Sequence, residues 1–309
     1  MSHSSPPSYQ PREGLFLAFG AFFIWGMGPV FFKFLQEVPT YEIIAYRIIW
    51  SQVLLCLSVI LTRSWPHVIA LAKQPKIVFL LYIASLVICT NWTLYVWAIN
   101  RGNILETSLG YYICPLTSVL LAIIFLKERF QLLQWVALSL ATVGILIQLW
   151  AYGTVPVIAL GIALTFSLYG FMHKKIGVDA MSSLFFETLF LVLPAILYLL
   201  YFTPESTTSN FFNNRLSLNL LLVASGIITT TPLFLFNAAA LRLKLSTLGI
   251  FQYMGPTMAF LFAVFIYREP MGFDKWVTFA FIWSGIALFV WDGLSFEYKN
   301  SHTLNKHSK

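Results

Sequence analysis

Two charged side chains, Glu187 and Arg47, lie within long apolar segments of the chain. Ionisable groups are costly inside a membrane segment, and those found there commonly mark proton relays or substrate pathways. We therefore assign coupling or gating to Glu187 and Arg47, with proton coupling through Glu187 as the hypothesis. The alternative for each residue is a structural hydrogen bond, or a side chain that extends to the lipid headgroups.

Aromatic and amide side chains form a second candidate set, spread over four other apolar segments. Aromatic rings can stack on an apolar ligand while amides orient it. Pro115 and Pro256 lie in two of these segments, and each frees a backbone carbonyl that can line a cavity. The set predicts a central site for a small amphipathic molecule, and the alternative is helix–helix hydrogen bonding and packing. Its members are Asn91, Trp92, Tyr95, Tyr112, Asn237, Gln252 and Tyr253.

The sequence lacks the common motifs of catalysis and of metal or cofactor binding. It contains neither a G-x-x-x-x-G-K-[ST] phosphate loop nor an H-E-x-x-H pair. His173 falls at the end of an apolar segment and the other histidines fall in tails or a linker, so we expect no histidine cluster inside the membrane. Cys56, Cys89 and Cys114 have no metal-binding spacing and are expected to pack as small apolar residues. We expect no enzymatic activity, no cofactor and no metal.

The composition indicates that the surroundings of these residues are a lipid bilayer. Of the 309 residues, 59% are hydrophobic and 10% are charged, whereas soluble domains have about 25% charged residues. This composition excludes a soluble domain and a disordered chain. The net charge is +7, but no basic tract exceeds two residues, so we expect no nucleic-acid partner. The expected partners are a small-molecule substrate and the bilayer.

Ten apolar segments are long enough to cross a bilayer, for which a helix needs about 20 residues. We therefore predict an all-α integral membrane protein with ten transmembrane helices. Lys and Arg are more numerous in the segments on the side of the N-terminus, which predicts that both termini are cytoplasmic. The segments are 14–35, 41–62, 77–99, 104–125, 131–150, 155–173, 183–202, 217–240, 246–267 and 273–292.

The sequence matches itself at an offset of 141 residues. Tyr112 falls on Tyr253, and Trp150 falls on Trp291. Because each copy has an odd number of helices, the second copy must enter the membrane from the opposite side, and inverted repeats of this kind recur in secondary transporters. The alternative is duplication in a scaffold or channel. The predicted units are a polar tail (1–13), a first five-helix repeat (14–150), a second five-helix repeat (155–292) and a second polar tail (293–309).

Several stretches resemble the drug/metabolite transporter superfamily in its EamA-type branch. The specific ones are LETSLGYY at 105–112, TTTPLFLFNAA at 229–239 and LSTLGIFQYMGP at 245–256. The resemblance covers about residues 12–293 and implies a ten-helix transporter in the bacterial inner membrane. One position departs from the family pattern, in which Asn usually precedes the proline of the fourth helix, because this chain has Cys114 there.

These observations predict a secondary transporter that moves small amphipathic metabolites or drugs by alternating access, with export favoured over uptake. A passive channel or facilitator with a fixed pore is the first alternative. A lipid flippase or an integral-membrane enzyme is the second, and the lack of clustered catalytic residues counts against the enzyme.

Overall fold

The computed structural model describes residues 11–101, 104–203, 208, 214–266, 272 and 276–292, and every regular element within these ranges is helical. Most of the predicted polar tails 1–13 and 293–309 lies outside the described residues. The helices are α1 (Pro11–Phe32), α2 (Thr40–Leu61), α3 (Trp65–Ala72), α4 (Pro75–Asn100), α5 (Ile104–Leu126), α6 (Leu132–Tyr152), α7 (Val157–Ile176), α8 (Ala180–Phe202), α9 (Leu216–Arg242), α10 (Leu245–Phe251), α11 (Met254–Leu261) and an unlabelled helix Trp276–Asp292, with a 3₁₀ turn η1 (Lys33–Leu35) and a π-helical turn η2 (Phe262–Ile266).

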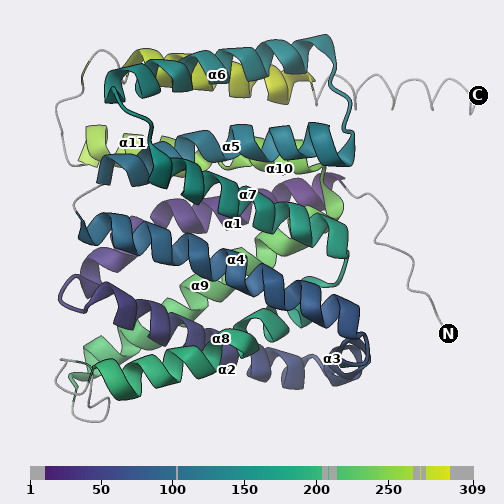
Figure 1. Cartoon of the computed structure of the whole chain (residues 1–309), viewed down its shortest axis with the longest axis vertical. Coiled ribbons are helices and arrows are strands. Elements are labelled where there is room, and N and C mark those ends of the chain that lie inside the picture. Colours follow the sequence, from purple (N-terminus) through teal and green to yellow (C-terminus); the bar gives the residue numbers. More distant parts are fainter. Residues whose placement is uncertain are drawn as a thin grey trace, which may run out of the picture.

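Eight of these helices are long and apolar enough to cross a membrane, namely α1, α2 and α4 to α9. The long helices run side by side across the view of Figure 1, from α6 at one end of the molecule to α2 and α8 at the other. Large apolar side chains such as Phe16, Leu57 and Leu200 are exposed on the outside of the bundle. Such surface would be costly in water and suits contact with lipid, so the chain is a multi-pass membrane protein.

The ninth predicted segment, 246–267, is broken. Helix α10 ends at Phe251, Gln252 and Tyr253 form a turn, and α11 begins at Met254. The amides of Gln252 and Tyr253 bond to carbonyls three residues back, and Pro256 has no N–H to continue the α-helical pattern. The tenth segment gives the shorter helix Trp276–Asp292.

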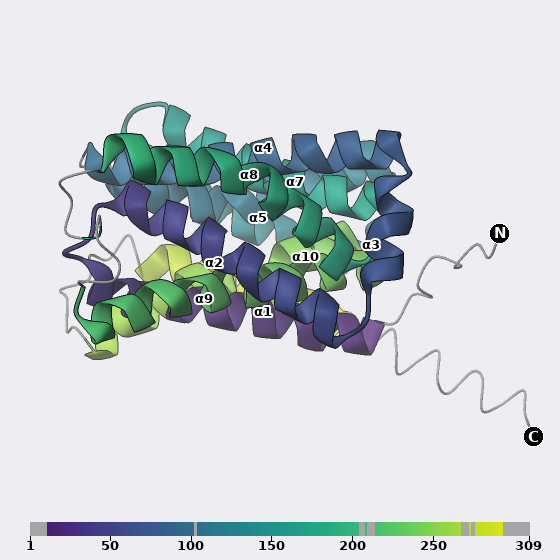
Figure 2. The same cartoon turned by 90° about the horizontal axis from the view of Figure 1, so that it is seen from below.

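The segment 63–76, predicted as a linker, contains the short helix α3. Pro66 lies in the first turn of α3, where a missing N–H is tolerated. The Trp65 ring packs edge-on against Phe185 of α8, with 5.7 Å between the ring centroids. Figure 2 shows α3 lying across the ends of the long helices, so this segment covers one end of the bundle.

The helices pack in a pattern that brings distant parts of the chain together. Helix α1 packs on α9, α4 packs on α7, and α2 lies against both α8 and α9. Helix α5 contacts α7 and α10. Glu128 caps the start of α10, because its carboxylate accepts the Leu245 N–H at 2.8 Å. The largest buried apolar cluster lies among these helices.

Candidate functional site

Glu187 lies in the interior of the bundle, seven residues from the start of α8, which is about 10 Å along the helix axis. Its side chain is surrounded by neighbouring helices and the residue is only 2% exposed. Helix α8 begins sharply, because the Asp179 side chain accepts the Ser182 N–H at 2.9 Å as an N-cap. This start fixes the depth of Glu187.

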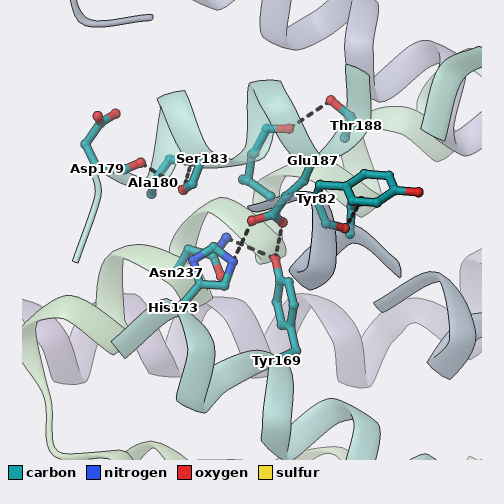
Figure 3. Close-up of polar contacts among 11 residues, drawn as sticks. Tyr82, Tyr169, His173, Asp179, Ala180, Ser183, Glu187, Thr188 and Asn237 are labelled. Carbon is teal, nitrogen blue, oxygen red and sulfur yellow. Dashed lines mark hydrogen bonds and ion pairs between the residues drawn. The ribbon is translucent and has the colours of Figure 1, made fainter. Parts of the chain in front are cut away.

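Three side chains from α7 and α9 surround the Glu187 carboxylate (Figure 3). His173 Nε2 lies 2.8 Å from Glu187 Oε1. The Tyr169 hydroxyl donates to Glu187 Oε2 at 2.9 Å, and Asn237 Nδ2 donates to the Tyr169 oxygen at 3.0 Å. We call Tyr169, His173, Glu187 and Asn237 the Glu187 cluster.

The Glu187 cluster is arranged to hold a proton. A proton between Glu187 Oε1 and His173 Nε2 can belong to either atom, so the pair is an ion pair or a neutral hydrogen bond. Either form avoids an unpaired buried charge. Among the described residues, Asn237 Oδ1 is buried without a hydrogen-bond partner, which leaves one acceptor of the cluster free.

Two members of the Glu187 cluster, Tyr169 and His173, were not among the predicted site residues. The expectation that no histidine would lie inside the membrane region is wrong for His173. Helix α7 continues to Ile176, so His173 is enclosed and only 2% exposed. Tyr169 and His173 are four residues apart and share a helix face, with ring centroids 4.5 Å apart. That spacing was the sequence signal.

Arg47 is the second charged residue of the predicted coupling pair, and it lies apart from Glu187. Helices α2 and α8 run antiparallel (Figure 1), and Thr188 donates a hydrogen bond to Gln52 between them. Measured along the helices from that bond, Arg47 and Glu187 differ in depth by about 9 Å. No ion pair joins them in the described chain.

The Arg47 guanidinium is held by one hydrogen bond and two aromatic rings. Nε donates to Thr229 Oγ1 of α9 at 2.7 Å. The guanidinium carbon lies 5.0 Å from the ring centroid of Phe32 and 5.3 Å from that of Trp92. Both distances fall within the range of cation–π contacts. The predicted residues Arg47 and Trp92 therefore meet in the structure.

Tyr95 extends this aromatic surface on α4. Its ring packs edge-on against Tyr111 of α5, with 5.8 Å between centroids. Both tyrosines lie within electrostatic range of Arg47. Tyr111 was not predicted as a site residue, although it precedes the predicted Tyr112. We call Arg47, Trp92, Tyr95 and Tyr111 the Arg47 group.

Asn91 joins α4 to α7. Its Nδ2 atom donates to the carbonyl of Ile162 at 2.8 Å and to Thr165 Oγ1 at 2.9 Å. The side chain is buried. These bonds match the alternative considered for this residue, which was hydrogen bonding between helices.

Gln252 belongs to a third polar group, at the break between α10 and α11. Its amide exchanges hydrogen bonds with the Ser118 hydroxyl, which donates to Ser167 of α7 at 2.9 Å. Cys114 Sγ lies 3.6 Å from Ser167 Oγ, so the residue at the unusual family position takes part in this group. The Tyr253 ring is buried nearby, and its hydroxyl has no partner among the described residues.

Tyr112 packs its ring against Phe279, with 5.7 Å between centroids. The predicted residues thus divide among three places. Asn237 joins Glu187, Trp92 and Tyr95 join Arg47, and Gln252 lies at the helix break. In the described part of the chain, no group of three or more metal-ligating side chains could hold an ion.

Comparison with known proteins extends the resemblance found in the sequence. The model of the EamA-like transporter family matches residues 12–150 and 154–291. The chain is 49% identical to Protein RarD of Salmonella typhi over 92% of its own length and 97% of that protein. It is 47% identical to Protein RarD of Escherichia coli (strain K12), with 94% and 98% covered.

A solved crystal structure with 18% sequence identity covers 90% of this chain and 97% of its own, with a TM-score of 0.68. At that identity the match concerns the fold alone. The family model covers nearly the whole chain, and the relatives named RarD match at close to half of the aligned positions. The chain therefore belongs to the EamA-like transporter family.

Proposed function

We propose that this chain is a proton-coupled secondary transporter, and not an enzyme, that exports small amphipathic metabolites or drugs. It lies in the bacterial inner membrane with both termini in the cytoplasm and works by alternating access between the repeats 14–150 and 155–292. The observation that carries the coupling is the buried contact between Glu187 and His173, 2.8 Å apart.

The helix bounds support the two-repeat arrangement. Shifted by 141 residues, α1 overlaps α7, α2 overlaps α8, and α4 overlaps α9. The packing follows the same correspondence, since α1 contacts α9 as α7 contacts α4. Repeated bounds together with repeated packing are expected when two copies share one fold.

Close approaches at glycines support a two-fold relation between the repeats. A Cβ atom on Gly20 would lie 3.2 Å from the Leu235 side chain, and one on Gly161 would lie 3.1 Å from the Leu94 side chain. Gly161 is the repeat equivalent of Gly20, and Leu235 that of Leu94. Such reciprocal contacts are the property of a two-fold interface.

A second reciprocal pair lies between α6 and the helix Trp276–Asp292. A Cβ on Gly144 would meet the Thr278 carbonyl oxygen at 3.0 Å, and one on Gly285 would meet the Ala137 carbonyl oxygen at 2.7 Å. These four positions again exchange at the same offset. Two copies related in this way can open toward either side of a membrane at similar energy, as alternating access requires.

The position of the Glu187 cluster supports proton coupling. His173 lies three residues before the end of α7, and Asn237 five residues before the end of α9. A proton can therefore reach the cluster over a short distance from one end of the bundle. Protonation at Glu187 changes the contact among α7, α8 and α9, which gives the proton a way to bias the packing of these helices.

Transport in proteoliposomes tests the proposal. A thermal-shift screen against metabolites and antibiotics identifies a ligand, because binding to the folded state raises apparent stability. Counterflow of that ligand then separates a carrier from a pore, since substrate on the opposite side accelerates a carrier alone. An imposed pH gradient should drive uptake into vesicles containing the unmodified protein.

The Glu187→Gln variant should retain counterflow and lose the response to the pH gradient. Glu13→Gln is the matched control, because Glu13 is an exposed carboxylate paired with Arg242 at the surface. Equal transport with and without the gradient in the unmodified protein would exclude proton coupling. Lipid scrambling without ligand counterflow would instead assign the chain to the flippases.

A further inference from the structure

Arg47 carries a charge inside the bundle without a protein counter-ion among the described residues. The ion pairs found there join His173 to Glu187 and Arg242 to Glu13. A guanidinium remains charged at all physiological pH values. Charged side chains in membrane segments usually pair with a partner or face a water-filled space, so the charge of Arg47 requires an anion or water.

The geometry leaves the far end of the Arg47 side chain open. Its Nε atom is used by Thr229, whereas the two terminal nitrogens make no hydrogen bond to a described residue. Phe32 and Trp92 contact the guanidinium at 5.0 and 5.3 Å, and these rings restrict its orientation. A planar fork of N–H groups held in this way matches the two oxygens of a carboxylate.

The surroundings of Arg47 are aromatic and accessible. Arg47, Tyr95 and Tyr111 are enclosed by neighbouring helices, yet Tyr111 is 45% exposed and the other two remain partly exposed. Side chains that are enclosed but accessible line an internal space. Aromatic rings around such a space can stack on the ring of a ligand.

We propose that the Arg47 group binds a small aromatic carboxylate, with the carboxylate on the Arg47 fork and the ligand ring against Trp92, Tyr95 and Tyr111. This inference rests on the proposed transport function and names the chemical class of its substrate. The carboxylate supplies the missing counter-ion, and the aromatic ring replaces water at the tyrosine surface. A neutral analogue of the same shape leaves the buried charge unpaired, which is the basis of selectivity.

Binding to the purified protein in a nonionic detergent tests the inference without a gradient or a membrane. The probes are phenylacetate and phenylacetamide, which share a ring and differ in charge. Phenylacetate should raise the melting temperature in a saturable way. Phenylacetamide should need a concentration at least about tenfold higher, since a charge-assisted hydrogen bond contributes a factor of this size to binding.

Variants of Arg47 assign the effect to this residue. Arg47→Gln should abolish the preference for phenylacetate over phenylacetamide. Arg47→Lys keeps the charge and loses the fork, so it should bind phenylacetate more weakly and still prefer it. Arg101→Gln is the matched control, because Arg101 also lies over a tryptophan, 5.4 Å from the Trp97 ring, but is exposed at the end of α4.

Three outcomes would overturn the inference. They are equal shifts by the two probes, an unchanged preference in Arg47→Gln, and a shift produced by short-chain phosphatidylglycerol but not by phenylacetate, which would assign Arg47 to a lipid headgroup. If Arg47→Gln does not fold, Arg47→Lys and the two probes on the unmodified protein still decide. Glu187→Gln should bind phenylacetate normally, so failure of this inference and failure of proton coupling are observed separately.

Discussion

The Glu187 carboxylate and the His173 imidazole lie 2.8 Å apart in the interior of the bundle, on two helices of the same repeat. The Tyr169 hydroxyl donates to the other carboxylate oxygen. The contact therefore joins an acid and a base that exchange protons near neutral pH to a hydrogen-bond donor that fixes the orientation of the acid.

A double-mutant cycle should show that Glu187 and His173 depend on each other. We expect a coupling energy of about 1–3 kcal/mol for Glu187→Gln with His173→Gln, because removing one partner leaves the other buried without its bond. The measurement is the free energy of unfolding in detergent for the two single variants and the double variant. The exposed pair Glu13 and Arg242 is the control, and it should couple by less than about 1 kcal/mol. Additive effects at Glu187 and His173 would contradict this prediction.

Gly226→Ala should destabilise the protein, because α2 and α9 approach closely there. A Cβ on Gly226 would lie 2.6 Å from Trp50 Cβ and 2.9 Å from the Ser51 backbone nitrogen. Backbone cannot move as a flexible side chain can, so we expect a loss of about 1–3 kcal/mol. Gly255→Ala is the matched control, since a Cβ there meets nothing within 4 Å, and it should leave stability unchanged or raised by up to about 1 kcal/mol. Thermal unfolding of both variants makes the comparison, and equal stability would refute it.

Asn91→Leu should weaken the joint between α4 and α7 while leaving substrate affinity unchanged. The substitution removes two hydrogen bonds to α7, and such bonds contribute about 1 kcal/mol in membrane proteins. Thr90→Val serves as the control, because the Thr90 hydroxyl is exposed and bonds within its own helix. Melting temperature and the affinity measured by counterflow are both needed. A loss of affinity at unchanged stability would instead place Asn91 in the substrate site.

Much of the fold could be predicted from hydropathy, because each lipid-spanning helix requires a long apolar run and satisfies its own backbone hydrogen bonds. The eight long helices follow the predicted segments closely. The break at Gln252 and Tyr253 was not predicted. Pro115 lies within the continuous helix α5, whereas α10 and α11 separate near Pro256, so a proline in an apolar run does not by itself specify a break.

The candidate site was predicted in part. Glu187 and Arg47 were found because charge is rare in apolar segments. His173 was missed because its distance from a helix end depends on where α7 stops, and helix ends are set by caps and packing. Here Gly177, with a φ of 67°, ends the helix, and a left-handed conformation suits glycine at that position.

The sequence by itself determined the surrounding solvent, the apolar helices, the offset of 141 residues and the family resemblance, because these depend on composition and local order along the chain. The tertiary structure decided which polar groups meet. Asn237 reaches Tyr169 and Thr229 reaches Arg47 across long separations in the chain. Such pairings depend on helix rotation and depth, which are fixed by packing between helices and by close approaches such as that at Gly226.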